Sequence, residues 1–117
     1  MKIEGDGQQL RVFIGESDRW QGRPLYEAIV LKAREMGMAG ATVMRGLMGF
    51  GANSRIHTAK VLRLSDDLPM VVEIADTPER IQAFLPELDR MVGEGLITLE
   101  RIHILAYRHN GGPCTDG

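Results

Sequence analysis

The sequence predicts an α+β fold with a four-stranded antiparallel sheet and two helices on one face of that sheet. Three observations support this prediction. The chain has 117 residues, which is the size of one domain with one core. Two segments carry apolar residues at helical spacing, and four segments have strand character. Their order is strand, helix, strand, strand, helix, strand. Two right-handed βαβ crossovers around a shared hairpin then give the ferredoxin-like plait, βαββαβ.

The first strand and the first helix follow a polar start. Residues 1–8 are polar and contain glycine, so we expect a flexible lead-in. Apolar residues then alternate and predict a strand over 9–15. A helix is expected over 24–36, because a proline opens it and one apolar stripe recurs along it. Gly37 is suited to cap the end of that helix.

The central hairpin is predicted from a glycine-rich stretch. Residues 41–48 form the second strand, and Gly46 interrupts the alternation as a bulge does. Gly49-Phe50-Gly51 is the exit from this strand, where glycines allow backbone conformations closed to other residues. The polar segment 52–67 is a long loop, and residues 70–74 form the third strand.

The second helix has a clear start and an interruption. Thr77 is its N-cap residue, and a proline follows in the first turn. Pro86 falls inside the apolar stripe and predicts a kink or a break near Phe84. Gly93-Glu94-Gly95 then ends the helix.

The last strand is expected over 96–107. Its apolar alternation changes phase between Leu99 and Ile102, which suggests a bulge. The domain would therefore span 9–108, with residues 109–117 as a flexible tail.

Bulk composition excludes several functional classes. The net charge is −2 and aromatic residues make up 5%, which argues against nucleic-acid binding and base stacking. A single cysteine, Cys114, rules out a disulfide framework and a cysteine-rich metal site. No apolar run reaches membrane-spanning length, and no signal-peptide core is present. We therefore expect a cytoplasmic protein without direct membrane insertion.

Two glycine segments are the candidate sites, and each has a structural alternative. Gly49-Phe50-Gly51 is either a backbone cradle for a ligand or the hinge of a long hairpin. Gly93-Glu94-Gly95 is either a helix stop or a nest of amides that holds phosphate. Neither matches a Walker or a Rossmann fingerprint. The histidines, serines and acids form no metal-binding or catalytic pattern, so we expect no enzyme and no metal site.

The second face of the sheet also carries apolar side chains, such as those of the Val71-Val72 pair and the final strand. Two helices can cover only one face. We therefore expect another copy of the protein to cover the second face.

The glycine-rich stretch GMAGATVMRGLMGFG, residues 37–51, resembles the second strand of PII signalling proteins. In those proteins a glycine-x-x-glycine-x-threonine-valine run leads to glycine-phenylalanine-glycine. Residues 68–74 are similar to the leucine-proline strand that follows the PII effector loop, and Gly93-Glu94-Gly95 to the turn before the last PII strand. Residues 10–107 as a whole resemble a PII-like family described only as a domain of unknown function, through LYEA, GATVMRGLMGFG, DDLP and GLIT.

The resemblance implies a homotrimer whose sheets line a central barrel, with adenine nucleotides bound in clefts between subunits. Residues 52–67 would be the T-loop, which in PII proteins reaches target proteins; a transporter or channel is a candidate target. The implied ligand-binding residues are Thr42, Gly49, Phe50, Gly51, Gly93, Glu94, Gly95 and Arg108. The cationic residues of the loop, which we expect to contact the partner or simply to be solvated, are Arg55, His57, Lys60 and Arg63.

Departures from the PII pattern point to a less charged ligand. Leu96 stands where PII proteins have a lysine, and only Arg108 and His109 follow Tyr107 as basic residues. Each lost charged contact would cost about 1.5–3 kcal/mol. One extra residue lies between Thr42 and the glycine exit, and the loop has no tyrosine for uridylylation. ADP, AMP or cyclic AMP is therefore expected before ATP, or no nucleotide at all.

A second reading stays open at this point. A CutA-like trimer with a structural role, or with a metal-responsive role through His57, would have the same fold and no nucleotide. An enzyme built across subunits is a third reading, for which the sequence names no nucleophile or base.

Overall fold

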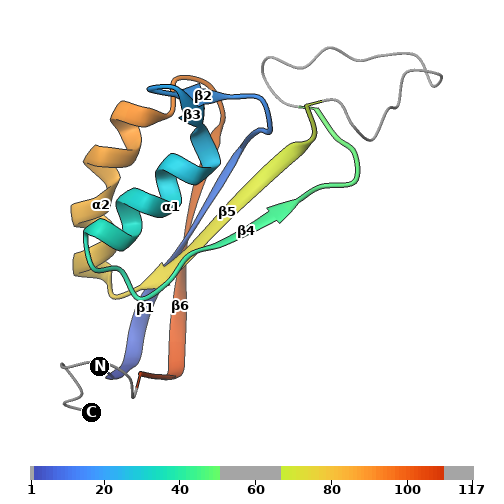
Figure 1. The fold of residues 1–117 in the computed structure, drawn as a ribbon. Coiled ribbons are helices and arrows are strands. Elements are labelled where there is room, and N and C mark those ends of the chain that lie inside the picture. The colour runs from blue at the N-terminus through green and yellow to red at the C-terminus, as the bar shows by residue number, and fades with distance from the viewer. Residues whose placement is uncertain (1, 51–66, 110–117) are drawn as a thin grey trace.

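The predicted fold class is confirmed. The structure, a computed structural model, describes residues 2–50 and 67–109. One antiparallel sheet has the strand order β4-β5-β1-β6, and helices α1 and α2 lie on one of its faces (Figure 1). The bounds are β1 Lys2–Gly15, α1 Leu25–Glu35, β4 Thr42–Arg45, β5 Pro69–Asp76, α2 Pro78–Met91 and β6 Leu96–Arg108. A short hairpin, β2 Arg19–Trp20 with β3 Arg23–Pro24, precedes α1.

The core lies between the helices and the two central strands. Successive strand residues point to opposite faces, so every second residue of β1 and β5 faces the helices. These residues and the inner stripes of both helices are buried, and the largest fully buried side chains are Leu10, Val12, Ile29, Val72, Ile74, Ile81, Phe84 and Leu88. Val72 therefore belongs to the core, and only Val71 of the predicted outer pair lies on the second face.

Local chemistry at the helix ends matches the sequence. Gly37 has a φ of 74° and closes α1, with Met38 N–H donating to the carbonyl of Ala33 at 3.0 Å. Thr77 Oγ1 accepts from Arg80 N–H at 3.3 Å and caps α2. Of the kink or break predicted at Pro86, the break is wrong, because α2 is one helix from Pro78 to Met91, and the kink stays a prediction. Core packing on both sides of the proline offsets the roughly 3 kcal/mol that an interior proline costs.

The first strand is longer than predicted. Residues 2–8 belong to β1 and are not a loose lead-in, because their backbone pairs with β6 out to Arg108. Since β5 pairs with β1 only from Gln8 onward, the preceding residues form a two-stranded ribbon with β6 that extends beyond the helices (Figure 1). The sequence did not predict this part of β1, because its residues are mostly polar and few of them pack against the core.

Both predicted bulges are misplaced. Pairing of β1 with β6 is continuous from Leu99 to Ile102, and the register shifts instead between Ile3 and Gly5. The phase change arises because apolar side chains of this edge strand switch from the helix face to the second face. In the central hairpin, β4 ends at Arg45, so Gly46 terminates the strand. Its N–H donates to the carbonyl of Pro69 at 2.7 Å, and a Cβ there would lie 2.7 Å from the Pro69 ring.

One buried carboxylate holds the α1–β4 connection to the sheet. Asp76 is fully buried and accepts from the N–H groups of Ala39 and Thr77, each at 2.7 Å. From the other side, the hydroxyl of Tyr107 on β6 donates to the carbonyl of Ala39 at 2.9 Å. The connection before Thr42 is therefore fixed from both sides. No helix in the described ranges has the length and apolarity to cross a bilayer.

Replacing Asp76 should strongly destabilise the fold. Asp76→Ala leaves two N–H donors without their charged acceptor, and we expect a loss of about 3 kcal/mol in the free energy of unfolding. Asp76→Asn should lose nearly as much, because it keeps one carbonyl acceptor but turns an NH2 donor toward the other N–H group. Urea denaturation measures both variants. Asp89→Ala, on the exposed side of α2, is the control and should stay within about 0.5 kcal/mol. Equal losses at the two positions would contradict this role for Asp76.

Candidate functional site

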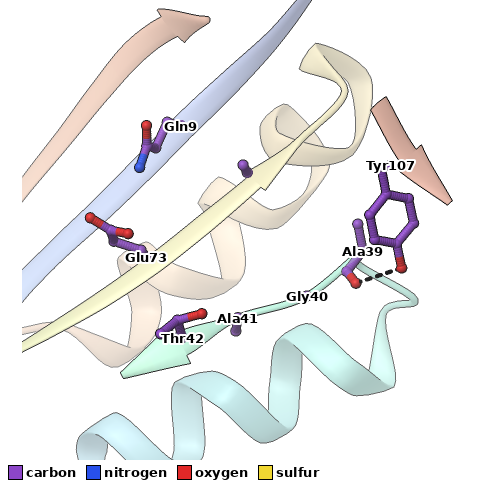
Figure 2. A pocket seen from close by; sticks show the side chains of 8 residues that line it. Gln9, Ala39, Gly40, Ala41, Thr42, Glu73 and Tyr107 are labelled. Atoms are coloured by element: carbon purple, nitrogen blue, oxygen red, sulfur yellow. Dashed lines mark hydrogen bonds between the residues drawn. The ribbon is translucent and has the colours of Figure 1, made fainter. Parts of the chain in front are cut away.

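A polar cavity opens on the face of the sheet that the helices leave bare. Its volume is about 340 Å³, inside the range of about 300–1,000 Å³ that is common for ligand sites. Thr42 and Glu73 are cross-strand neighbours, and their side chains project beside that of Gln9 (Figure 2). The lining residues are Gln9, Ala39, Gly40, Ala41, Thr42, Glu73, Ala75 and Tyr107. Hydroxyl, amide and carboxylate groups therefore surround a space with small apolar walls.

The Glu73 carboxylate is held by an arginine. Arg11 Nε donates to Glu73 at 2.8 Å, and its Nη1 donates to Glu100 at 3.0 Å. These two hydrogen bonds raise the pKa of Arg11 above its ordinary value. The three side chains come from neighbouring strands of the sheet and carry one negative charge in excess. Arg11 thus fixes Glu73 at the rim of the cavity while its own charge is already neutralised.

The two glycine segments lie at the same end of the sheet but at opposite edges. Met44, Val71, Phe13 and Leu96 are register partners in one row across the four strands. Gly49 follows one end of this row, and Gly95 precedes the other. Three strand spacings separate the edges, about 14 Å. One protomer therefore does not bring the two segments together.

A positive φ and a close contact explain both glycines. Gly95 has a φ of 152°, and a Cβ there would lie 2.8 Å from the carbonyl oxygen of Phe13. Gly49 has a φ of 155°, and its Cβ would lie 3.1 Å from the ring of Pro69. Both positions exclude side chains for reasons internal to the protomer. A substitution at Gly95 therefore changes the fold as well as any ligand site.

A second cavity connects the Gly93 turn to the corner after β1. It has a volume of about 160 Å³ and is lined by Asp18, Arg19, Leu25, Met91, Gly93 and Glu94. Asp18 accepts from Gly15 N–H at 3.0 Å. In the same corner, Ser17 N–H donates to Asp67 Oδ1 at 2.9 Å, and Glu16 N–H donates to the carbonyl of Leu68 at 2.8 Å. The turn 15–18 thus lines this cavity through Asp18 and also contacts Asp67 and Leu68, with which the described chain resumes.

The described residues among those predicted from the sequence occupy four separate places. Thr42 lines the larger cavity, whereas Gly93 and Glu94 line the smaller one. Phe50 is 69% exposed beyond β4. Arg108 pairs with Lys2 at the far end of β6, about 40 Å along the strand from the Gly93 turn. Five predicted residues lie outside the described ranges, namely Gly51, Arg55, His57, Lys60 and Arg63.

Sequence reasoning missed most of the cavity lining. Arg11 and Glu73 had a readable signal, because each is a charge on the outward side of an otherwise apolar strand. Gln9 shares that side. Tyr107 had no signal in the sequence, because its hydrogen bond to Ala39 joins the last strand to a connection 68 residues away.

Comparison with known proteins identifies the family. Residues 7–104 match the family DUF190, described as "Uncharacterized ACR, COG1993". A UPF0166 protein of Aquifex aeolicus (strain VF5) is 40% identical over 96 residues, covering 82% of this chain and 90% of that protein. The chain belongs to the DUF190 family. A UPF0166 protein of Methanocaldococcus jannaschii is 31% identical over 96 residues, covering 81% of this chain and 88% of that protein.

Solved structures with the same fold include a nitrogen regulatory PII-like protein, CPII. CPII of Thiomonas intermedia K12, bound to ADP and bicarbonate, has a TM-score of 0.58 at 16% identity, covering 89% of this DUF190 chain and 91% of its own. The GlnK–ATP complex of B. subtilis has a TM-score of 0.55 at 14% sequence identity, covering 86% of this chain and 84% of GlnK. CutA of Synechococcus elongatus PCC7942 has a TM-score of 0.58 at 14% sequence identity, covering 92% of this chain and 85% of CutA. The resemblance to a PII-like family of unknown function is confirmed.

No group of three histidine, cysteine or acidic side chains in the described parts of this DUF190 chain is arranged to hold a metal ion. The metal-responsive reading named His57, which lies outside those parts, so that reading stays a prediction.

The two glycines of the Gly93 turn should respond differently to alanine. Gly95→Ala forces a Cβ against the β1 backbone at a positive φ, and we expect a loss of about 1–3 kcal/mol in unfolding free energy. Gly93→Ala meets nothing within 4 Å and should change stability by less than about 0.5 kcal/mol. Chemical denaturation compares the two. A Gly95→Ala protein as stable as Gly93→Ala would mean that the close approach to Phe13 is not a constraint.

Proposed function

We propose that this DUF190 protein is a cytoplasmic, non-enzymatic PII-like regulator. It binds an adenine nucleotide in clefts between the subunits of a homotrimer and signals through residues 52–67 to a partner protein, such as a membrane transporter or channel. The observation that carries the proposal is the cavity beside Thr42. It opens on the uncovered sheet face, in a fold shared with proteins solved in complex with ADP and ATP.

The groups around the cavity suit a nucleobase better than a phosphate chain. Thr42 and Gln9 offer both donors and acceptors, and Glu73 can accept from an amino group. Ala41 and Ala75 provide small apolar walls for a flat ring. The described lining contains no lysine or arginine. Phosphates must therefore be bound by other segments, which favours ADP or AMP over ATP.

The uncovered face supports assembly into a ring. The row of Met44, Val71, Phe13 and Leu96 is apolar from edge to edge, and its end members are 44% and 57% exposed. The next row contains Arg11, which its own protomer already neutralises. Such a face can be buried against copies of itself, because burial of the apolar row is favourable and Arg11 already has its partners within the protomer.

The edges of the sheet support a cleft between subunits. In a closed ring, the β4 edge of one subunit meets the β6 edge of the next. Gly49 and Phe50 would then face residues 93–95 of the neighbour, across a gap that neither subunit closes alone. The base would lie in the cavity beside Thr42, and the backbone amides of the neighbour's turn would lie near the phosphates. Arg108 stays a candidate for contact with another subunit.

A path from ligand to loop exists within one protomer. The turn 15–18 lines the Gly93 cavity through Asp18 and holds Asp67 and Leu68 at the end of the loop. A ligand that draws the Gly93 turn into a new position would shift this corner. The loop then changes its state only if the two states differ in ligand affinity.

Calorimetry with ADP, AMP, ATP and cyclic AMP tests the proposal. We expect saturable binding of at least one nucleotide, with ADP or AMP bound more tightly than ATP. Thr42→Val keeps the shape of an exposed strand residue and removes its hydroxyl, so affinity should fall about three- to tenfold. Thr98→Val, on the same face beside Arg11, is the matched control and should leave affinity unchanged. No measurable binding of any of the four nucleotides would refute the proposal that the protein senses a nucleotide.

Sedimentation tests the trimer separately. The wild-type chain should sediment at three times the mass of one protomer. Leu96→Glu is tolerable in a lone protomer, because Leu96 is 57% exposed, but it places a charge in the apolar row and should give monomers with unchanged circular dichroism. Leu31→Glu, at a 40% exposed position on the helix side, should remain trimeric. A monomeric wild type, or a trimeric Leu96→Glu, would refute the proposed interface.

A CutA-like role without nucleotide is the second candidate. The CutA likeness has the same TM-score, 0.58, as that to CPII. A stable trimer that ignores all four nucleotides would favour this candidate, and metal-dependent stability lost in His57→Ala would support it further.

A further inference from the structure

A groove on the helix side of the molecule is not used by the proposed nucleotide site. It lies between the β2–β3 hairpin and the two helices, and its volume is about 270 Å³. Ala28 and Met91 are buried and form an apolar floor, whereas most other lining groups are polar or charged. The lining residues are Trp20, Gln21, Arg23, Ala28, Leu31, Lys32, Glu35, Arg90 and Met91.

The hairpin places the only tryptophan of the chain in this groove. Trp20 is partly buried against the core and pairs across the hairpin with Arg23. The hairpin is closed by a hydrogen bond from Arg19 Nη2 to the carbonyl of Gly22 at 3.0 Å. It is joined to the start of α1 by Leu25 N–H, which donates to the carbonyl of Asp18 at 2.8 Å. The indole ring is therefore presented by a fixed frame.

The charges of the groove are predominantly positive. Lys32 and Arg90 share one carboxylate, Glu87, at 4.0 Å and 2.7 Å, and Lys32 also lies 3.4 Å from Glu35. Among the described residues, Arg23 has no ion pair. Three cations thus face two carboxylates, although the chain as a whole carries a charge of −2. The excess is local to the groove.

We propose that this groove binds a small aromatic anion, a flat ring that carries a carboxylate or phosphate. The ring would lie on the indole of Trp20 and the apolar floor, because offset aromatic pairs are favourable at such contacts. The acid group would lie between Arg23 and Arg90, whose guanidinium groups form charge-assisted hydrogen bonds with oxyanions. The volume is close to the lower end for ligand sites, about 300 Å³, which suits a single ring with one acid group.

The single tryptophan makes the proposal directly testable by NMR. One indole N–H resonance should shift saturably when ¹⁵N-labelled protein is titrated with phenyl phosphate. Inorganic phosphate and phenol, which each carry half of the probe, should shift it weakly or not at all. The titration is repeated with saturating ADP. An unchanged response places the site apart from the nucleotide cleft, so failure of either proposal can be told from failure of the other.

Two arginine variants decide the role of the charges. Arg23→Gln should weaken phenyl phosphate binding about tenfold, and Arg23→Gln with Arg90→Gln should weaken it further. Arg34→Gln makes the same change on α1 at the lining of a separate cavity and should leave binding unchanged. The proposal is overturned if the wild type shows no saturable shift, if phenol alone reproduces it, or if the double variant binds like the wild type.

Discussion

The fold rests on two helices packing against one face of a four-stranded sheet. This contact buries alternate residues of β1 and β5 together with the inner stripes of α1 and α2, and it sets which side chains face away. The opposite face is then fixed by register alone. It carries one apolar row at the loop end and a charged row centred on Arg11 behind it. The cavity beside Thr42, the surface proposed to meet further copies and the separation of the two glycine turns all follow from this division.

The parts of the fold that depend on that contact were predictable from the sequence, and the parts that depend on edges were not. The alternation in β1, the helical stripes, the Thr77 cap and the Gly37 cap all have local signals, and all were correct. The extension of β1 to Lys2 has no such signal, because a ribbon without a core to face carries no apolar alternation. The phase change in β6 was misread as a bulge, since on an edge strand apolar residues can occupy both faces.

The site shows the same limit. Thr42 was indicated by the resemblance to PII proteins, whereas the Gly93 turn also had a local signal in its glycine spacing. Gln9, Glu73 and Tyr107 join Thr42 only through strand order, which brings residues 9, 42, 73 and 107 to one cavity. Hydrophobic periodicity does not predict which residues far apart in the sequence will lie in the same cavity. It can, however, indicate Arg11 and Glu73, since a charge on the outward side of an apolar strand needs a partner on the neighbouring strand.

Leu96 bears on both the charge of the expected ligand and the proposed contact between subunits. It follows the Gly93 turn at the position where PII proteins carry a lysine, and it ends the apolar row as the register partner of Phe13. A lysine there would add a phosphate contact but would place a charge in the surface proposed to meet other copies. Burying an unpaired charge costs several kcal/mol, more than the roughly 1.5–3 kcal/mol that a charged hydrogen bond contributes. An apolar residue at this position therefore favours the subunit contact over phosphate charge, which is the physical reason to expect a nucleotide with fewer phosphates than ATP.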